Sequence, residues 1–341
     1  MIDRDPEDSF ETLWTTFYKR YPFFDVRGVD WREQYARYRP EVTAKTTDEE
    51  LFGILCALLA PLRDGHVTLT ATMSGQTRHF CPEKKPRFWQ EFDAGDIEEL
   101  FATTGKTLVA NGFGPEAGTQ AWMLRYCRSR AVGYMRILEL EGITKHDLVA
   151  ALDRMARDFS DLNGYIIDIR NCLGGDDSTA ITIINRFCDR RRTAFHRQTK
   201  IGPGEQELTP TRTWYIEPQG DVQFRGPIAL LTCDSVFSGG EAFALAMRAL
   251  PYVTIVGEHT NGIFSYELEK TLPNGWRYTL PYQKYYSPAM ICYEGQGVPV
   301  DIELLNKKVD IEVGIDPLII RALEVLKSGT CRDNHQDLHT L

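Results

Sequence analysis

The stretch GPIALLTCDSVFSGGEAFALAM, residues 226–247, decides the fold of this chain. It reads as an apolar strand, a short polar turn and a helical run, which is the strand-turn-helix unit of α/β proteins. Ser238 stands at the junction, and the glycines after it let its hydroxyl lie at a helix N-terminus, where unpaired backbone N–H groups can meet a developing oxyanion. Ser238 is therefore a candidate nucleophile, with an ordinary structural turn as the alternative.

Strands and helices alternate on both sides of this stretch. One neighbouring segment, GYIIDIRNCLGG at 164–175, is an apolar strand that ends in paired glycines, and another, TIVGEHTNG at 254–262, is a third strand. Such alternation predicts a parallel sheet covered by helices. We expect strands at 133–138, 165–169, 228–232 and 254–257, and helices at 144–159, 177–188 and 240–249.

Together these segments resemble the core of the tail-specific and tricorn-type serine peptidases, whose patterns run DLRxNxGG, then S/T-x-S-x-x-E, then VGExTxG. The resemblance continues in the same order through 272–275 (LPNG), 285–288 (YYSP) and 297–302 (GVPVDI). It implies an α/β, crotonase-like (ClpP/crotonase) core with a parallel sheet and helices. It also implies an endopeptidase or carboxy-terminal processing peptidase that forms an acyl-enzyme on Ser238.

The identity of the general base differs from that in the tail-specific branch of this family. Tail-specific members carry a lysine shortly after the VGE-x-T segment, whereas Ile263 follows Gly262 here. The segment LRDGHV at 62–67 is similar to the L-x-D-x-H segment of tricorn-type members, which implies His66 as base, and a histidine that only caps a helix is the alternative. An imidazole base predicts activity that rises with pH near a pKa of about 6.5.

The resemblance assigns the remaining site groups. Glu294, shortly before the G-V-x-x-D segment, would orient the base, while Gly65 stands where tricorn-type members have a helpful serine. The N–H of Gly239 would receive the oxyanion together with that of Gly174 or Gly175. Three charged residues near these segments, Asp168, Arg170 and Glu241, are expected to be structural.

The sequence predicts a helical N-terminal domain over 1–70, a connecting or cleft-covering segment over 71–130, a peptidase core over 131–327 and a tail over 328–341. In the first of these, Thr47 and Glu50 form a capping box before an apolar helical stripe at 51–62. We recognise no carboxylate-binding loop of a PDZ module. The proline-rich segment 193–223 reads as a long excursion or hairpin, and Pro273-Asn-Gly275 reads as a hairpin turn.

Composition limits the partners and the compartment. A formal net charge of −9 argues against nucleic acid or an anionic membrane surface, and we expect no membrane span. Eight scattered cysteines read as reduced thiols, which suits the cytoplasm. The alternative is a periplasmic or secreted location, if an export signal has been removed. We expect no cofactor and no metal, since His335 and His339 lie in a polar tail.

The expected partner is a peptide or protein substrate, and the expected state is a monomer or small homo-oligomer. The alternative function is a non-catalytic binding protein for a peptide or hydrophobic ligand on the same scaffold, as in the family's retinoid-carrying relatives. Convergence of the serine, histidine and glutamate would favour the enzyme.

Overall fold

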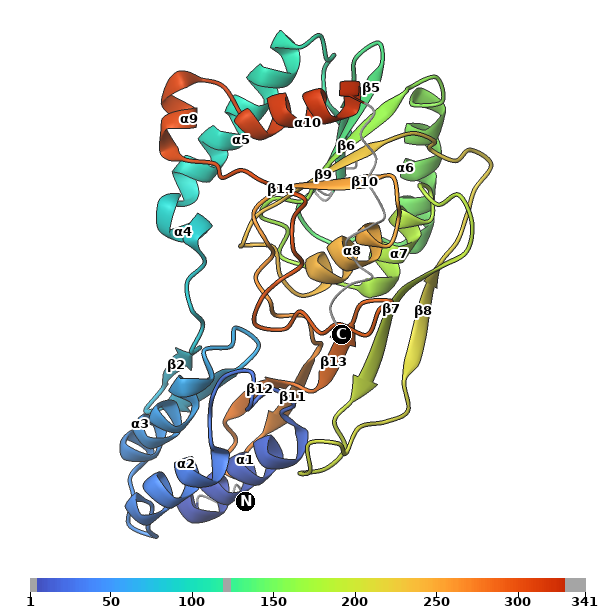
Figure 1. Ribbon diagram of the computed structural model, residues 1–341. Helices are drawn as coiled ribbons and strands as arrows, with labels where there is room; N and C mark the ends of the chain where they lie inside the picture. Colours follow the sequence, from blue (N-terminus) through green and yellow to red (C-terminus); the bar gives the residue numbers. More distant parts are fainter. Residues whose placement is uncertain (1–4, 119–123, 329–341) are drawn as a thin grey trace. The chain divides into compact units, whose positions relative to one another are not determined.

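The computed structural model describes residues 5–118 and 124–328, which form two compact units (Figure 1). The N-terminal unit comprises Met1–Lys84, Arg197–Arg212 and Ile263–Tyr285, and the C-terminal unit comprises Lys85–His196, Thr213–Gly262 and Tyr286–Leu341. Both units are discontinuous in sequence, whereas the boundaries expected from the sequence are contiguous. Most of the expected tail, from residue 329 onward, lies outside the described residues, and so do His335 and His339.

Three helices and a four-stranded sheet build the N-terminal unit. Side-chain caps begin each helix, and the third has the predicted capping box between Thr47 and Glu50. Apolar faces of the helices pack on the antiparallel sheet, which has the order β11-β12-β1-β2. The elements are α1 (Pro6–Arg20), α2 (Trp31–Tyr38), α3 (Asp48–Leu59), β1 (Thr68–Met73), β2 (Gln76–Phe80), β11 (Glu267–Thr271) and β12 (Arg277–Pro281).

The hairpin β11–β12, with its turn at the predicted Pro273-Asn-Gly275, pairs with β1 although almost 200 residues of chain separate them. Leu69 of β1 stands opposite Tyr278 of β12, and both are buried in the unit's core. The sequence gives no sign of this pairing, because each strand alone reads only as a short amphipathic segment. The N-terminal helices therefore fold onto strands that come from the far end of the chain.

A seven-stranded sheet forms the centre of the C-terminal unit, in the order β14-β10-β9-β6-β5-β4-β3. The five strands from β14 to β5 are parallel, and β4 and β3 are antiparallel at one edge. The mixed α/β fold with a parallel sheet is thus as predicted. The strands are β3 (Ala117–Gly118), β4 (Leu124–Arg128), β5 (Val132–Ile137), β6 (Gly164–Asp168), β9 (Ile228–Thr232), β10 (Val253–Gly257) and β14 (Ile302–Glu303).

Helices cover both faces of this sheet. Figure 1 shows α5 and α10 on one side and α7 and α8 on the other. Strand β9 is buried along its whole length, as its apolar run predicts, and its Ala229 and Leu231 pack with Leu318 and Ile319 of α10. The helices are α4 (Arg87–Glu91), α5 (Ala94–Ala110), α6 (Lys145–Asp158), α7 (Asp177–Ile184), α8 (Gly239–Arg248), α9 (Lys308–Val313) and α10 (Pro317–Ser328).

Strands β7 (Arg192–Thr199) and β8 (Arg212–Ile216) occupy the segment expected to be a long excursion or hairpin. They belong to a third sheet, of order β13-β7-β8, with β13 at Gln283–Tyr286. Each of these three strands contains a boundary between the units. Within the described residues, no helix has the length and apolar character needed to cross a bilayer.

The register of the parallel strands sets the position of the site. Asp168 at the end of β6 pairs with Leu231, and Thr232 at the end of β9 pairs with Gly257 at the end of β10. The three loops that follow, at 169–176, 233–238 and 258–262, therefore leave the same edge of the sheet. In open α/β sheets this carboxyl edge is where ligands bind.

Candidate active site

Ser238 occupies a strained position directly before α8. Its backbone dihedrals are φ 57° and ψ −128°, a region that non-glycine residues rarely adopt. A sharp strand-to-helix turn of this kind lifts a serine hydroxyl away from the sheet, as the nucleophile elbow of α/β-hydrolases does. Ser238 is partly exposed while its neighbours Gly239 and Gly240 are buried, so its side chain can be reached from outside.

Paired glycines bring the loop after β6 against the nucleophile. A Cβ atom added to Gly174 would lie 2.8 Å from the Cβ of Ser238 and 2.9 Å from the backbone N of Gly239. A Cβ atom added to Gly239 would lie 2.2 Å from the carbonyl oxygen of Gly175. Gly174 and Gly175 also have φ values of +90° and +128°, which side chains disfavour. The structure therefore brings together four of the predicted site residues, backbone against backbone.

The amide groups at this contact differ in their partners. In the described part of the chain, the N–H groups of Gly175 and Gly239 donate to no other backbone group. The amide of Gly174 interacts instead with the thiol of Cys172, whose pKa burial raises to about 12 and this amide lowers in part. Gly175 is thus the better placed of the two candidates for a second oxyanion donor.

Glu294 is buried in a loop that packs on the segment after β10. The N–H of the next residue, Gly295, donates to the carbonyl oxygen of Gly262 at 2.8 Å. Gly262 in turn donates its N–H to Glu241 of α8 at 2.8 Å. The predicted orienting carboxylate therefore belongs to a loop that is linked, through Gly262 and Glu241, to the helix that begins at the nucleophile.

Glu241 has contacts that fit the structural role expected of it. Its fully buried carboxylate accepts hydrogen bonds from the Thr260 hydroxyl and from Gly262 N–H. The Thr260 hydroxyl oxygen accepts from Val298 N–H at 2.7 Å. The glutamate that ends the S/T-x-S-x-x-E motif and the threonine of the VGE-x-T motif thus hold one another in place.

His66 lies in the N-terminal unit, between the single turn Ala60–Leu62 that follows α3 and strand β1. Its backbone N–H donates to the carboxylate of Asp64 at 3.0 Å, and Asp64 also accepts from Tyr21 at 2.8 Å and faces Arg27 at 3.5 Å. Burial lowers the pKa of His66 to about 4, while Asp64 raises it and Arg27 lowers it further. The imidazole is therefore neutral at pH 7, the form a general base requires. That His66 reaches Ser238 stays a prediction.

Asp64 is a functional candidate that the sequence reasoning passed over, although it is the aspartate of the L-x-D-x-H segment. It is completely buried and fixes the backbone of His66. Its place two residues before the candidate base, within the L-x-D-x-H segment, is the signal in the sequence that could have identified it.

Asp168 and Arg170 form a structural ion pair, as predicted. Arg170 is fully buried and donates from Nε to Asp168 at 2.9 Å and from Nη2 at 2.6 Å. It also contacts Asp316, before α10, at 2.8 Å. Burial by itself lowers the pKa of Arg170, and the two carboxylates raise it to well above its usual range. This network joins the end of β6 to α10.

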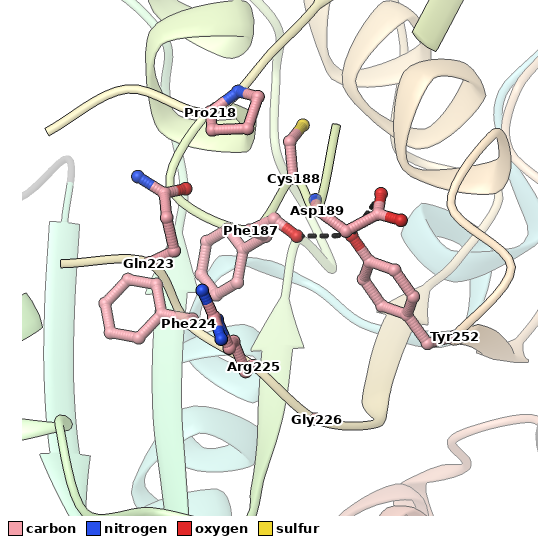
Figure 2. A pocket seen from close by; sticks show the side chains of 9 residues that line it. All are labelled: Phe187, Cys188, Asp189, Pro218, Gln223, Phe224, Arg225, Gly226 and Tyr252. Carbon is pink, nitrogen blue, oxygen red and sulfur yellow. Dashed lines mark hydrogen bonds between the residues drawn. The ribbon is translucent and has the colours of Figure 1, made fainter. Parts of the chain in front are cut away.

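A cavity of about 550 Å³ in the C-terminal unit does not coincide with this site (Figure 2). Gly226 and Tyr252, which line it, precede β9 and β10, so the cavity lies at the amino ends of these strands. Its Tyr252 hydroxyl donates to the carbonyl oxygen of Phe187 and accepts from Asp189 N–H at 3.1 Å. The nucleophile follows the opposite ends of the same strands.

Comparison with known proteins agrees with these features. The model of peptidase family S41 matches residues 131–304, more than half of the chain, and that of the tricorn protease C1 domain matches residues 2–60. The carboxy-terminal processing protease CtpA of Bacillus subtilis (strain 168) is 25% identical over 144 residues, which are 42% of this chain and only 28% of CtpA.

Solved structures extend the similarity over nearly the whole chain. A candidate peptidase from Parabacteroides merdae ATCC 43184 is 27% identical, with a TM-score of 0.77 over 95% of this chain and 97% of that one. Mature CPAF shares the fold at 12% identity, with a TM-score of 0.70 over 96% of this chain and 99% of that one. With a family model that matches more than half of its length, the chain belongs to peptidase family S41.

Proposed function

We propose that this chain is a serine peptidase that hydrolyses peptide bonds through an acyl-enzyme on Ser238. The observation that carries the proposal is the strained turn at Ser238, which is packed backbone to backbone against Gly174 and Gly175. An ordinary structural turn requires neither a serine with a positive φ nor a second, glycine-containing loop packed against it. Strain of this kind costs about 1–3 kcal/mol and is retained where function requires it.

In the proposed reaction, the Ser238 oxygen attacks the carbonyl carbon of the scissile peptide while His66 takes the hydroxyl proton. The oxyanion that forms receives hydrogen bonds from the N–H groups of Gly239 and Gly175. His66 then gives its proton to the leaving amine, and the C–N bond breaks. A water molecule, deprotonated by His66, cleaves the resulting ester and regenerates the serine.

Glu294 is proposed to hold the imidazole of His66 in orientation and to stabilise the imidazolium that forms in each half of the reaction. Its burial supports this role, because a buried carboxylate interacts more strongly with a nearby cation than an exposed one does. Membership in family S41 supports a peptide or protein substrate. The name of the relative CtpA favours cleavage near a carboxyl terminus, which we propose as the mode of action.

A fluorophosphonate probe tests the nucleophile directly. We expect intact-mass analysis to show one adduct on the wild-type protein, none on Ser238→Ala, and loss of proteolysis in the same variant. His66→Ala should remove most turnover and labelling. An unlabelled wild-type protein, under conditions that label a control hydrolase, would favour the non-catalytic binding protein. Normal turnover in His66→Ala would make that histidine a helix cap only.

A further inference from the structure

The short helix α4 (Arg87–Glu91) contacts all three loops at the carboxyl edge of the sheet. It stands at the start of the C-terminal unit, beginning three residues after the chain leaves the N-terminal unit at Lys84. None of the motifs recognised in the sequence includes it. Arg87 and Phe88 both bond to Asp234, the Arg87 side chain also bonds to Glu258, and Trp89 bonds to Asn171.

The beginning of α4 is capped by the nucleophile loop. Its N-cap residue is Pro86, whose side chain accepts no hydrogen bond, so the first N–H groups of the helix need another acceptor. Asp234, four residues before Ser238, accepts from Arg87 N–H at 2.5 Å and from Phe88 N–H at 2.9 Å. The carboxylate thus ties the loop to the helix through both of its oxygens.

The guanidinium of Arg87 holds the loop after β10. Its Nε lies 3.0 Å from both oxygens of Glu258, and its Nη2 donates to one of them at 2.8 Å. Glu258 is the glutamate of the VGE-x-T motif and is largely buried. A bidentate pair with a largely buried carboxylate fixes geometry more tightly than a single contact would.

Trp89 holds the loop that carries the oxyanion glycines. Its indole Nε1–H donates to the side-chain oxygen of Asn171 at 2.9 Å, and the same oxygen accepts from the Ser235 hydroxyl at 3.3 Å. Asn171 has φ 59° and lies three residues before Gly174. The Trp89 ring also meets that of Phe237, next to the nucleophile, edge to face with centroids 6.4 Å apart.

We propose that Arg87 and Trp89 are positioning residues for the reaction at Ser238. This inference rests on the proposed function. Ser238 and the donor Gly239 lie on one loop and the donor Gly175 on another, and the two loops meet through backbone packing and the Ser235–Asn171 hydrogen bond, so an error in either loop moves an N–H group away from the developing charge. The single helix α4 holds these two loops, and the loop after β10, in position relative to one another. It acts on the transition state and touches no substrate.

The test removes one hydrogen bond and keeps an aromatic ring, although a smaller one. Trp89→Phe loses the indole N–H but can still pack on Phe237. Tyr252→Phe is the matched control, because it also removes one polar group from a ring in the same unit, at the opposite edge of the sheet. The readouts are the second-order rate of fluorophosphonate labelling, kcat and KM on fluorescently labelled casein, and the urea midpoint.

For Trp89→Phe we expect the labelling rate and kcat to fall about 10- to 100-fold, the range that a misplacement of about 1 Å causes, with KM unchanged. For Tyr252→Phe we expect a lower urea midpoint with unchanged labelling and kcat. Hydrogen exchange over 171–175 and 233–239 should quicken in Trp89→Phe and stay unchanged in Tyr252→Phe.

Wild-type labelling and kcat in Trp89→Phe would overturn the positioning role, and so would equal losses in both variants. Failure of the proposed function looks different, since the wild-type protein itself would then carry no adduct on Ser238. Arg87→Lys gives a second arm: it keeps the charge but cannot pair in the bidentate way, so we expect it to lower kcat without changing KM.

Discussion

The burial of His66 predicts a specific pH dependence of stability. Burial lowers the imidazole pKa from its ordinary 6.5 to about 4 in the folded protein. Between these values the unfolded chain binds a proton that the folded chain does not, so the free energy of unfolding falls as the pH drops from 6.5 towards 4. Below 4 both states are protonated and the contribution is lost completely.

The size of the effect follows from the two pKa values. At about 1.4 kcal/mol per pKa unit, the full difference amounts to about 3 kcal/mol. At pH 5, where the unfolded imidazole is almost fully protonated and the folded one is not, about 2 kcal/mol of this is already lost. A loss of this size is a large part of the stability of an ordinary domain.

Glu83, which lies near His66, also has a shifted pKa, so the test compares the wild type with a variant that lacks the imidazole. Burial raises the pKa of Glu83, with Asp64 raising it further, and a carboxyl of that kind adds stability as the pH falls. His66→Gln removes the imidazole and leaves this group in place. Urea unfolding of both proteins at pH 7 and pH 5 should show that the wild type loses about 2 kcal/mol more than His66→Gln.

The same pKa governs the proposed base. The acid limb of fluorophosphonate labelling should fall below pH 5, rather than near the 6.5 expected of an ordinary imidazole. An equal loss of stability in wild type and His66→Gln would refute the burial of the ring. If labelling instead falls with a midpoint at pH 6.5 or above, the imidazole in the working enzyme is not the buried group described here.

Three further changes follow from the geometry. Gly174→Ala places a methyl group 2.8 Å from the Ser238 Cβ at φ +90°, so labelling should slow at least about 10-fold with a loss of about 1–3 kcal/mol in urea unfolding; normal labelling would separate this glycine from the site. Glu294→Gln should keep the fold by circular dichroism and lower kcat by less than Ser238→Ala does; an unchanged kcat would remove Glu294 from the mechanism. Asp316→Asn leaves buried Arg170 with one carboxylate and should cost about 3–5 kcal/mol by urea unfolding without changing KM, whereas wild-type stability would show that Asp168 alone suffices.

Local patterns in the sequence predicted much of the C-terminal unit. The apolar run 228–232 forms the buried strand β9, and α8 begins at Gly239, directly after Ser238 and one residue earlier than expected. The paired glycines at 174 and 175 adopt the positive φ values that only glycine tolerates easily. These features are readable because strand burial, helix initiation and glycine conformation depend on residues close together in the chain.

The contacts that complete the site depend on residues far apart. Trp89 reaches Asn171 across 82 positions, Phe88 reaches Asp234 across 146, and Arg87 reaches Glu258 across 171. The hairpin after residue 266 joins the N-terminal helices in the same way. The sequence by itself predicted candidate residues for the chemistry and the elements on which they lie. Only the tertiary structure decided what holds them, because the pairing of distant polar groups leaves no periodicity for a sequence to display.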